Sequence, residues 1–324
     1  VLLWGVEING TKGWFRFAGF SIQPAEFSKL AVLLATGSLL SIEGISVKNV
    51  RGFGLLSVIF LIPIILTALQ PDFGTSVIIL GIFWGILYWA DFNLNILVLL
   101  LAIPILTLFY LKGWVEFAIA LLLLTIGLLY INRLKIVPVI VSLAIVIAIP
   151  LGSKDIINHL SPHQQTRIQA FIDPSFEPEK GGYNLIQSLL AVGSGGVFGK
   201  GILSGTQTQL RYVYAQPSDF VFSVPAEEFG FVGAFSIILV FTILIIRLIK
   251  IGLQSTSLFF KYIVLGYATL LSVHFIQNIG MVIGLLPVMG IPLPFLSSGG
   301  SFFVVNSFLV GIALNAYRRS QLKQ

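Results

Sequence analysis

Residues 231–249 read Phe-Val-Gly-Ala-Phe-Ser-Ile-Ile-Leu-Val-Phe-Thr-Ile-Leu-Ile-Ile-Arg-Leu-Ile, with Arg247 as the single charged side chain. A helix that crosses a bilayer needs roughly 20 consecutive, mostly apolar residues. The whole chain of 324 residues shares this character, because it is 56% hydrophobic and 10% charged with a mean hydropathy of +0.99. Soluble domains contain about 25% charged residues. The composition therefore predicts an integral membrane protein.

Further apolar stretches of similar length occur along the chain. The expected spans lie at 24–44, 53–69, 74–90, 94–111, 115–131, 136–151, 231–249, 260–286 and 301–317. We expect an all-α fold, a polytopic transmembrane helical bundle with about nine spans, forming one membrane domain over 1–324. Val1–Ile8 reads as the tail of one more apolar helix, so N-terminal spans are expected upstream of this chain.

The basic residues predict the orientation, because Lys and Arg collect in short cytoplasmic loops. If 9–23 lies outside, ten of the nineteen basic residues fall on the inside: Lys48, Arg51, Arg133, Lys135, Arg247, Lys250, Lys261, Arg318, Arg319 and Lys323. The short outside loops hold Lys12, Arg16 and Lys112. This bias predicts a cytoplasmic C-terminus and a large extracytoplasmic loop over 152–230. Within the loop, 181–193 resembles a short amphipathic helix and 194–201 is rich in turn residues.

Charged residues next to the expected spans need an explanation, because burying a charge in a membrane is costly. Glu26 and Lys29 lie three residues apart and share one helix face, which fits either an ion pair at the membrane surface or a substrate-binding pair. Asp72 fits a helix cap better than a binding residue. Glu227 and Glu228 precede the span at 231, where the helix dipole favours acidic residues.

Two segments favour a functional cavity. Residues 287–301 hold three prolines, three glycines and three serines between two spans. Irregular backbone near a membrane is tolerated where protein or a water-filled cavity surrounds it, so this segment is expected to line a cavity, with an external Pro-rich turn as the alternative. Asp219 stands in a polar loop that runs into hydrocarbon-like sequence, and partial desolvation makes a carboxylate a better proton acceptor.

Metal chemistry through Cys or His is not expected. The chain has no Cys, and its three His residues, His159, His163 and His274, lack a ligand spacing such as His-Glu-x-x-His.

Several segments together resemble one known family. They are Gln-Pro-Ala-Glu-Phe-Ser-Lys (23–29), Gln-Pro-Asp-Phe-Gly-Thr-Ser (70–76), Arg-Ile (167–168), Gly-Gly-Tyr-Asn-Leu-Ile-Gln-Ser (181–188), Gly-Lys-Gly-Ile-Leu-Ser-Gly-Thr-Gln (199–207), Ser-Asp-Phe-Val-Phe (218–222), Glu-Glu-Phe-Gly-Phe-Val-Gly (227–233), Asn-Ile-Gly-Met (278–281) and Pro-Phe-Leu-Ser-Ser-Gly-Gly-Ser (294–301). Their order and spacing resemble the SEDS family (shape, elongation, division and sporulation) of bacterial wall synthesis. The Gly-Thr-Gln after Gly-Lys-Gly resembles its RodA branch. Compared with the family pattern, the resemblance implies that 113–152 forms an additional helical hairpin.

The resemblance implies a peptidoglycan glycosyltransferase of the bacterial cytoplasmic membrane that polymerises lipid II at the outer face and works with a class B penicillin-binding protein. Its catalytic Asp corresponds to Asp219. The substrate-binding candidates are Trp14, Arg16, Glu26, Lys29, Asp72, Lys200, Glu227, Glu228, Ser297 and Ser298. Arg16, Lys29 and Lys200 are the basic candidates for the leaving pyrophosphate, with a divalent cation, Mg²⁺ or Mn²⁺, as further support. No nucleic-acid partner is expected.

The chain departs from the family pattern at several points. Gly13 stands where the family has Arg before Trp14, and Ser298 and His163 each replace a usual Tyr. Val-Tyr-Ala-Gln (213–216) replaces an acidic Leu-Pro-Glu. Two other functions fit the same pattern. A lipid II flippase or transporter also needs buried ionisable residues, and a noncatalytic scaffold for the penicillin-binding protein would tolerate replacement of Asp219.

Overall fold

The computed structural model describes most of the chain. The described residues are 1–2, 4–8, 11–17, 20–132, 136–151, 165, 169, 171–172, 182–210 and 212–322. Outside them lie His159, His163, the Arg-Ile pair at 167–168, Gly181, and the basic residues Arg133, Lys135 and Lys323, so the expectations for these positions stay predictions.

A helix forms at each of the nine expected spans. These helices are α1 (Pro24–Leu40), α2 (Val50–Ala68), α3 (Phe73–Trp89), α4 (Leu94–Lys112), α5 (Trp114–Ile131), α6 (Ile136–Leu151), α12 (Gly230–Gln254), α13 (Leu258–Val282) and α14 (Gly300–Gln321). Among the described residues, six helices are long and apolar enough to cross a membrane: α2, α4, α5, α12, α13 and α14. A count of nine spans stays a prediction.

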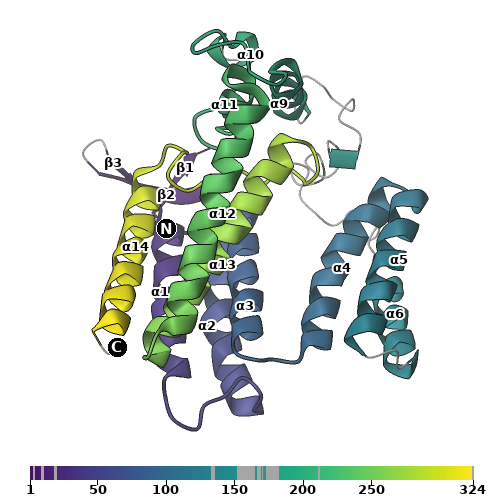
Figure 1. Ribbon diagram of the computed structural model, residues 1–324, viewed down its shortest axis with the longest axis vertical. Coiled ribbons are helices and arrows are strands. Elements are labelled where there is room, and N and C mark those ends of the chain that lie inside the picture. Colours follow the sequence, from purple (N-terminus) through teal and green to yellow (C-terminus); the bar gives the residue numbers. More distant parts are fainter. Residues whose placement is uncertain are drawn as a thin grey trace.

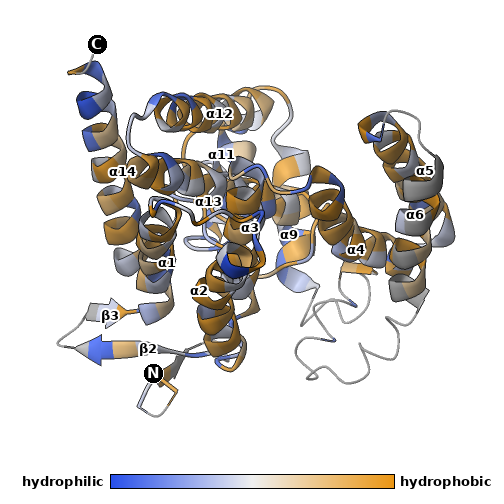
Figure 2. Cartoon of the chain, turned by 90° about the horizontal axis from the view of Figure 1, so that it is seen from below, coloured by the Kyte–Doolittle hydropathy of each residue, from blue (hydrophilic) through white to orange (hydrophobic). Residues whose placement is uncertain are grey.

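Helix α13 is the centre of the bundle, with α1, α3, α12 and α14 packed around it (Figure 1). Half of its apolar window (50%) is buried inside the protein, whereas the figure for α12 is 11%. Small residues let α3 approach α13 closely: a Cβ on Gly85 would lie 2.2 Å from Thr269 Cγ2, and one on Gly81 would lie 2.7 Å from Val273 Cγ2. The helices are drawn mostly in the hydrophobic colour (Figure 2), and many of their large apolar side chains, such as Leu122, Phe235 and Phe308, are exposed, as expected for contact with lipid.

Helices α4, α5 and α6 pack on one another around a separate apolar cluster that includes Leu106, Phe117 and Val146. Figure 1 shows this group set to one side of the α13-centred bundle. The amides of Asn95 and Asn132 exchange two hydrogen bonds, 2.9 and 3.1 Å long, which join the start of α4 to the end of α5. Helices α5 and α6 occupy the expected extra hairpin.

The N-terminal region differs from the expectation. Strands β1 (Val6–Ile8), β2 (Thr11–Phe17) and β3 (Phe20–Ile22) form an antiparallel sheet in the order β1-β2-β3. Trp14 pairs with Val6, and Arg16 pairs with Ser21. The all-α expectation is therefore wrong here, as is the expected helix tail at Val6–Ile8, because aromatic and β-branched residues in β2 favour a strand. The protein is mostly helical with one small sheet.

The described segments between α6 and α12 form a cap at one end of the bundle (Figure 1). The cap contains α9 (Tyr183–Ser194), α10 (Thr206–Gln209) and α11 (Ser223–Glu228). Helix α9 confirms the expected short amphipathic helix, since it buries Leu185, Ser188 and Ala191 along one face. The turns after it are held close to α12. Phe231 N–H donates to the Gly196 carbonyl at 2.9 Å, and a Cβ on Gly199, whose φ is +80°, would collide with the Glu228 carbonyl.

Candidate functional site

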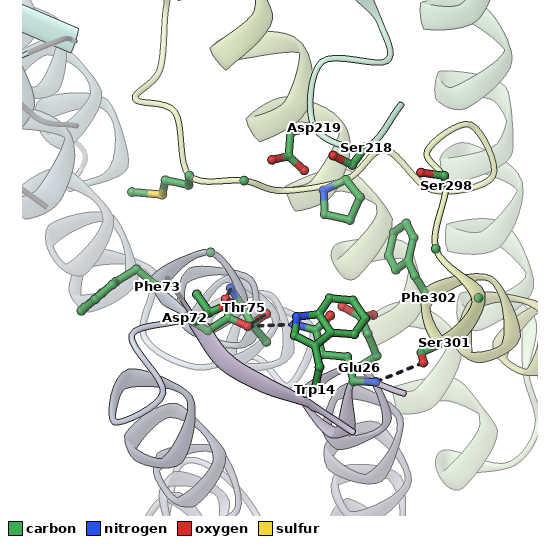
Figure 3. Close-up of a pocket in the computed structure, with 18 of the residues that line it drawn as sticks. Trp14, Glu26, Asp72, Phe73, Thr75, Ser218, Asp219, Ser298, Ser301 and Phe302 are labelled. Carbon is green, nitrogen blue, oxygen red and sulfur yellow. Dashed lines mark hydrogen bonds between the residues drawn. The ribbon is translucent and has the colours of Figure 1, made fainter. Parts of the chain in front are cut away.

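A polar cavity of about 230 Å³ lies where the cap meets the helix ends (Figure 3). Its lining comprises Thr11, Trp14, Gln23, Glu26, Pro71, Asp72, Phe73, Gly74, Thr75, Ser218, Asp219, Met289, Gly290, Pro292, Ser298, Gly299, Gly300, Ser301 and Phe302. These residues come from β2, from the starts of α1, α3 and α14, and from two loops. Three of them are carboxylates, and none of the described lining residues is Lys or Arg.

Asp219 lies across the cavity from Trp14, Glu26 and Asp72 (Figure 3). Its backbone is fixed on both sides: its N–H donates to the Ala215 carbonyl at 3.0 Å, and its carbonyl accepts from Asn278 Nδ2 at 2.7 Å. A Cβ on Gly290, whose φ is +70°, would stand 3.3 Å from Asp219 Oδ2. Glycine at 290 therefore leaves room for this carboxylate next to a residue in the left-handed region.

The irregular segment between α13 and α14 supports the Asp219 loop. Ser297 Oγ donates to the Ser218 carbonyl, and the Ser298 N–H donates to the Pro217 carbonyl at 2.8 Å. The expectation that 287–301 lines a cavity is confirmed, because residues from Met289 to Ser301 form one wall. Of the two serine candidates, Ser298 lines the cavity and Ser297 secures the loop behind it.

Asp72 is the N-cap of α3. Its Oδ1 accepts from the Thr75 N–H at 3.0 Å, and its Oδ2 accepts from Thr75 Oγ1 at 2.8 Å and from Gln23 Nε2 at 3.1 Å. These bonds satisfy free donors at the helix start. The cap explanation is thus confirmed, and the same carboxylate also faces the cavity.

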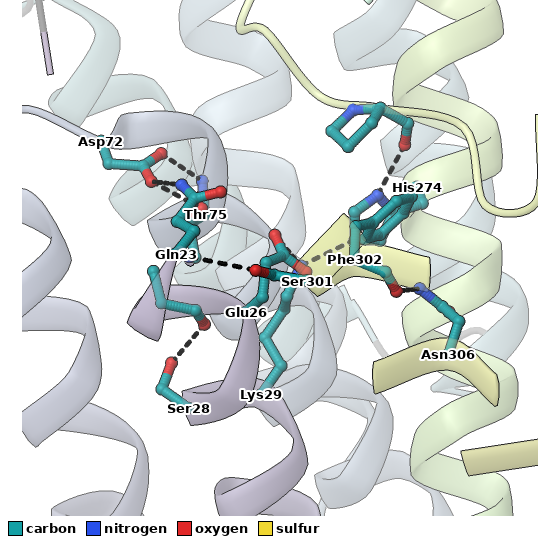
Figure 4. Close-up of polar contacts among 12 residues, drawn as sticks. Gln23, Glu26, Ser28, Lys29, Asp72, Thr75, His274, Ser301, Phe302 and Asn306 are labelled. Carbon is teal, nitrogen blue, oxygen red and sulfur yellow. Dashed lines mark hydrogen bonds and ion pairs between the residues drawn. The ribbon is translucent and has the colours of Figure 1, made fainter. Parts of the chain in front are cut away.

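Glu26 and Lys29 form a buried ion pair rather than one at the surface (Figure 4). Lys29 Nζ lies 2.8 Å from each carboxylate oxygen of Glu26, and the side chains are 1% and 5% exposed. Nζ also lies 3.3 Å from His274 Nε2 and 5.2 Å from the centre of the Phe302 ring. Glu26 faces the cavity and Lys29 is enclosed beneath it, so Lys29 does not reach a ligand in this arrangement.

Lys200, Glu227 and Glu228 lie outside the cavity, in the cap. Glu227 is fully buried and accepts from Lys200 Nζ at 2.7 Å, from the Thr208 N–H at 2.9 Å and from Thr208 Oγ1 at 2.8 Å. Burial raises the pKa of Glu227, but hydrogen bonds from Lys200 and from the Gln207 and Thr208 amides outweigh it and lower the pKa from 4.5 to about 2. Glu228 accepts from Gln209 Nε2 at 2.6 Å.

The structure thus brings five of the predicted site residues together around one cavity. They are Trp14, Glu26, Asp72, Asp219 and Ser298. Arg16 is exposed two residues after Trp14 on β2, so both side chains project from the same face of the strand. Of the three basic candidates, Lys29 and Lys200 are each paired with a carboxylate, which leaves Arg16 as the candidate on the face that carries Trp14.

Sequence reasoning did not single out His274, Gln277 or Asn278 as site residues. All three are buried on α13 and reach the loops that form the cavity wall. The available signal was their position: polar side chains at i, i+3 and i+4 inside an otherwise apolar helix are expensive and therefore informative.

A divalent cation finds no ready set of protein ligands here. Within the described residues, no group of three or more Asp, Glu or His side chains is placed to hold a metal ion. Asp219 and Asp72 stand on opposite sides of the cavity (Figure 3). The donor set of the described residues does not fit a resident metal ion.

Comparisons with known proteins agree on one family. The cell cycle protein family of FtsW, RodA and SpoVE matches residues 1–119 and 115–322. The chain is 30% identical over 345 residues to the peptidoglycan glycosyltransferase RodA of Treponema pallidum, covering 98% of this chain and 79% of that protein. It is 31% identical over 319 residues to stage V sporulation protein E of Bacillus subtilis, covering 98% of this chain and 74% of that one.

The fold is also similar to a solved one. A chain in a structure of a peptidoglycan synthase complex that coordinates polymerization and crosslinking superimposes with a TM-score of 0.67 at 24% identity, covering 99% of this chain and 77% of that chain. The six helices of membrane-spanning length and hydropathy found within the described part of the chain agree with these matches. The chain is a multi-pass membrane protein of the FtsW/RodA/SpoVE cell cycle protein family.

Proposed function

We propose that this chain is a peptidoglycan glycosyltransferase that joins the sugar units of lipid II into glycan strands, with Asp219 as the general base. The observation that carries the proposal is the position of Asp219 on the wall of a polar cavity. Relatives across nearly the whole chain are named peptidoglycan glycosyltransferases, and the family resemblance aligns its catalytic Asp with Asp219.

The reaction requires a base because an alcohol is a weak nucleophile. The 4-hydroxyl oxygen of one GlcNAc forms a bond to the anomeric carbon of a MurNAc on a second lipid II. The bond from that carbon to the pyrophosphate oxygen breaks, and undecaprenyl pyrophosphate leaves with the electron pair. Asp219 accepts the proton of the attacking hydroxyl, a role worth typically about 10²–10⁴ in rate. Arg16 is the basic side chain offered to the departing pyrophosphate.

An apolar cavity next to the polar one suits the polyprenyl tail. It has a volume of about 620 Å³, and residues of α3, α4 and α13, such as Trp84, Val98 and Val273, line it. Met289 lines both cavities. A lipid-linked saccharide seated across Met289 would place its tail among apolar side chains and its pyrophosphate and sugar beside Asp219.

The distribution of charge supports an outward-facing site and a cytoplasmic C-terminus. The last turn of α14 carries Arg318 and Arg319. Figure 1 shows that the C-terminal end lies at the same end of the bundle as the α1–α2 connection, which contains Lys48, whereas the cap lies at the opposite end. Basic residues mark the cytoplasmic side, so Asp219 faces the outside of the cytoplasmic membrane of the bacterial cell.

The partner in this proposal is a class B penicillin-binding protein, which would cross-link the glycan that this chain polymerises. The support is the similar fold in a complex that coordinates polymerization and crosslinking. Membrane lipid surrounds the helices, and lipid II is the substrate.

The test is polymerisation of purified lipid II by the purified protein in lipid nanodiscs, with and without the penicillin-binding protein, read as glycan ladders on a gel. We expect ladders that lengthen with time. A parallel assay in liposomes follows fluorescent lipid II between leaflets. Transfer of lipid II without glycan would overturn the proposal in favour of a flippase, and partner binding without either activity would favour a scaffold.

A further inference from the structure

Helix α13 holds the cavity wall with three buried side chains. Gln277 Nε2 donates to the Pro287 carbonyl at 3.0 Å, Asn278 Nδ2 donates to the Ile291 carbonyl at 2.8 Å, and His274 Nδ1 lies 2.8 Å from the Pro292 carbonyl. Irregular backbone at membrane depth persists where its polar groups are satisfied by protein. The segment from 287 to 292 therefore owes its path to this polar face of α13.

His274 differs from the other two residues because its second ring nitrogen is also engaged. Nε2 lies 3.3 Å from Lys29 Nζ (Figure 4). An ammonium group has donors and no acceptor, and a carbonyl oxygen accepts and never donates. Nε2 must therefore accept from Lys29, and Nδ1 must carry the proton that it donates to Pro292. These two contacts assign His274 as a neutral imidazole with its proton on Nδ1.

The contacts form a continuous bridge beneath the cavity. Glu26 faces the cavity and binds Lys29, Lys29 donates to His274, and His274 donates to the Pro292 carbonyl. Pro292 also lines the cavity, on the wall that passes Gly290 beside Asp219. The exposed fractions of Lys29 and His274 are 1% each, so water does not compete for these bonds.

We infer that His274 is a positioning residue for the transferase reaction. As a neutral, Nδ1-protonated bridge, it ties the Glu26–Lys29 pair to the 287–292 segment, and so fixes the floor of the cavity relative to the wall that supports Asp219. The effect on catalysis rests on the proposed function, whereas the protonation pattern and the bridge do not. A misplacement of about 1 Å at a catalytic site can cost about 10²-fold in rate. Loss of the bridge is therefore expected to lower the rate of polymerisation.

The bridge itself is tested without any activity assay. Protein labelled with ¹⁵N-histidine, in nanodiscs at neutral pH, is studied by nitrogen NMR, and His274→Phe identifies the signals of His274 among the three histidines. We expect Nδ1 protonated and Nε2 unprotonated. In the paired variant Glu26→Gln/Lys29→Met, which leaves no buried charge behind, the Nε2 signal should shift because its donor is gone. A proton on Nε2, on both nitrogens, or an unchanged signal in the paired variant would overturn the inference.

The positioning role is tested by steady-state polymerisation. His274→Phe retains a ring of similar shape without either bond, and His274→Asn retains a donor near Pro292 but is too short to reach Lys29. We expect kcat to fall by about 10²-fold in His274→Phe and to fall in His274→Asn as well, with KM little changed. Thr242→Ala, on a lipid-facing part of α12 where the hydroxyl bonds to the Ile238 carbonyl of its own helix, is the control for handling.

The outcomes separate the two proposals. If His274→Phe polymerises at the wild-type kcat, or if His274→Asn does so, the positioning role is wrong. If the effect of His274→Phe is as large in the Glu26→Gln/Lys29→Met background as in the wild type, the histidine does not act through the ion pair. A wild-type protein that shows the Nδ1 proton but makes no glycan overturns the proposed function and the catalytic role of His274, and leaves the bridge standing.

Discussion

The carboxylates of Asp219 and Glu227 are close in sequence, yet their surroundings differ. Glu227 is fully buried and receives hydrogen bonds from Lys200, Gln207 and Thr208. Asp219 is held by its backbone, and its side chain forms part of a cavity wall. Both residues lie in the stretch 218–233, which contributes to the family resemblance, and the resemblance alone gives both a place in the site.

The difference is one of position: Glu227 is enclosed by the loops of the cap, whereas Asp219 lies on the wall of the polar cavity. A buried carboxylate whose acceptors are saturated by local donors organises the loops that supply them. A carboxylate on a cavity wall can exchange a proton with a bound hydroxyl. In this chain Glu227 ties the α10 region to α11, and the proposed function gives Asp219, on the cavity wall, the role of the base.

The change with the largest expected effect is Asp219→Asn, which keeps the shape of the side chain and removes its basicity. We expect the lipid II polymerisation rate to fall by about 10²–10⁴-fold, while the thermal unfolding temperature stays close to that of the wild type. Gel-based polymerisation and a thermal melt of the same nanodisc sample measure both. Wild-type activity in this variant would show that Asp219 is not the base, and the contrast with Glu227 would fail.

Glu227→Ala should show the opposite pattern. Lys200 and the donors of Gln207 and Thr208 lose their acceptor, and each buried donor left unsatisfied costs about 1–3 kcal/mol. We expect a clear drop in unfolding temperature, with activity lost in proportion to unfolding. Lys200→Met is the matched control. It should destabilise less, since Glu227 keeps its other donors and Lys200 is 25% exposed. A fully folded Glu227→Ala protein without activity would instead place Glu227 in the reaction.

Acid should weaken the cap through Glu227. Its pKa is lowered from 4.5 to about 2 in the folded protein, so its stabilising contribution is complete above pH 4.5 and is lost as the pH falls toward about 2. The measurement is the difference in unfolding temperature between wild type and Glu227→Gln at several pH values, which cancels the other acidic groups. We expect this difference to shrink in that window. A difference independent of pH across this window would mean that folding does not lower the pKa of this carboxylate.

The apolar stretches were sufficient to locate the long helices, since every expected span contains one. The sheet could not be read in the same way, because Thr11–Phe17 is short and its value as a strand depends on pairing with Val6–Ile8 and Phe20–Ile22. The strand conformation of Thr11–Phe17 therefore depends on its pairing with neighbouring strands and not on its own sequence alone.

The site was predictable where a charge stood out against hydrocarbon, as with Asp219 and Glu26. It was not predictable which charges share a cavity. Lys200 and Glu227 were predicted as substrate contacts because the sequence shows a charge and not its partner; in the structure they form an ion pair with each other, outside the polar cavity. His274 was considered only as a metal ligand, whereas its importance arises from two contacts, with Lys29 and Pro292, that are distant in sequence.

Asp72 tests the comparison further because it both lines the cavity and supports the fold as a helix cap. Its substitution has the smallest expected effect on stability and activity. It lines the cavity as Asp219 does, and Thr75 and Gln23 donate hydrogen bonds to its two oxygens, which cap α3. Asn is as good an N-cap as Asp, whereas Ala costs about 1 kcal/mol at such a position. Asp72→Ala should therefore lower the unfolding temperature slightly, and Asp72→Asn should leave both stability and polymerisation near wild type. If Asp72→Asn instead lost activity as severely as Asp219→Asn while remaining folded, Asp72 would take part in the reaction as well as cap α3, and a role as a helix cap would not separate a structural carboxylate from a reactive one.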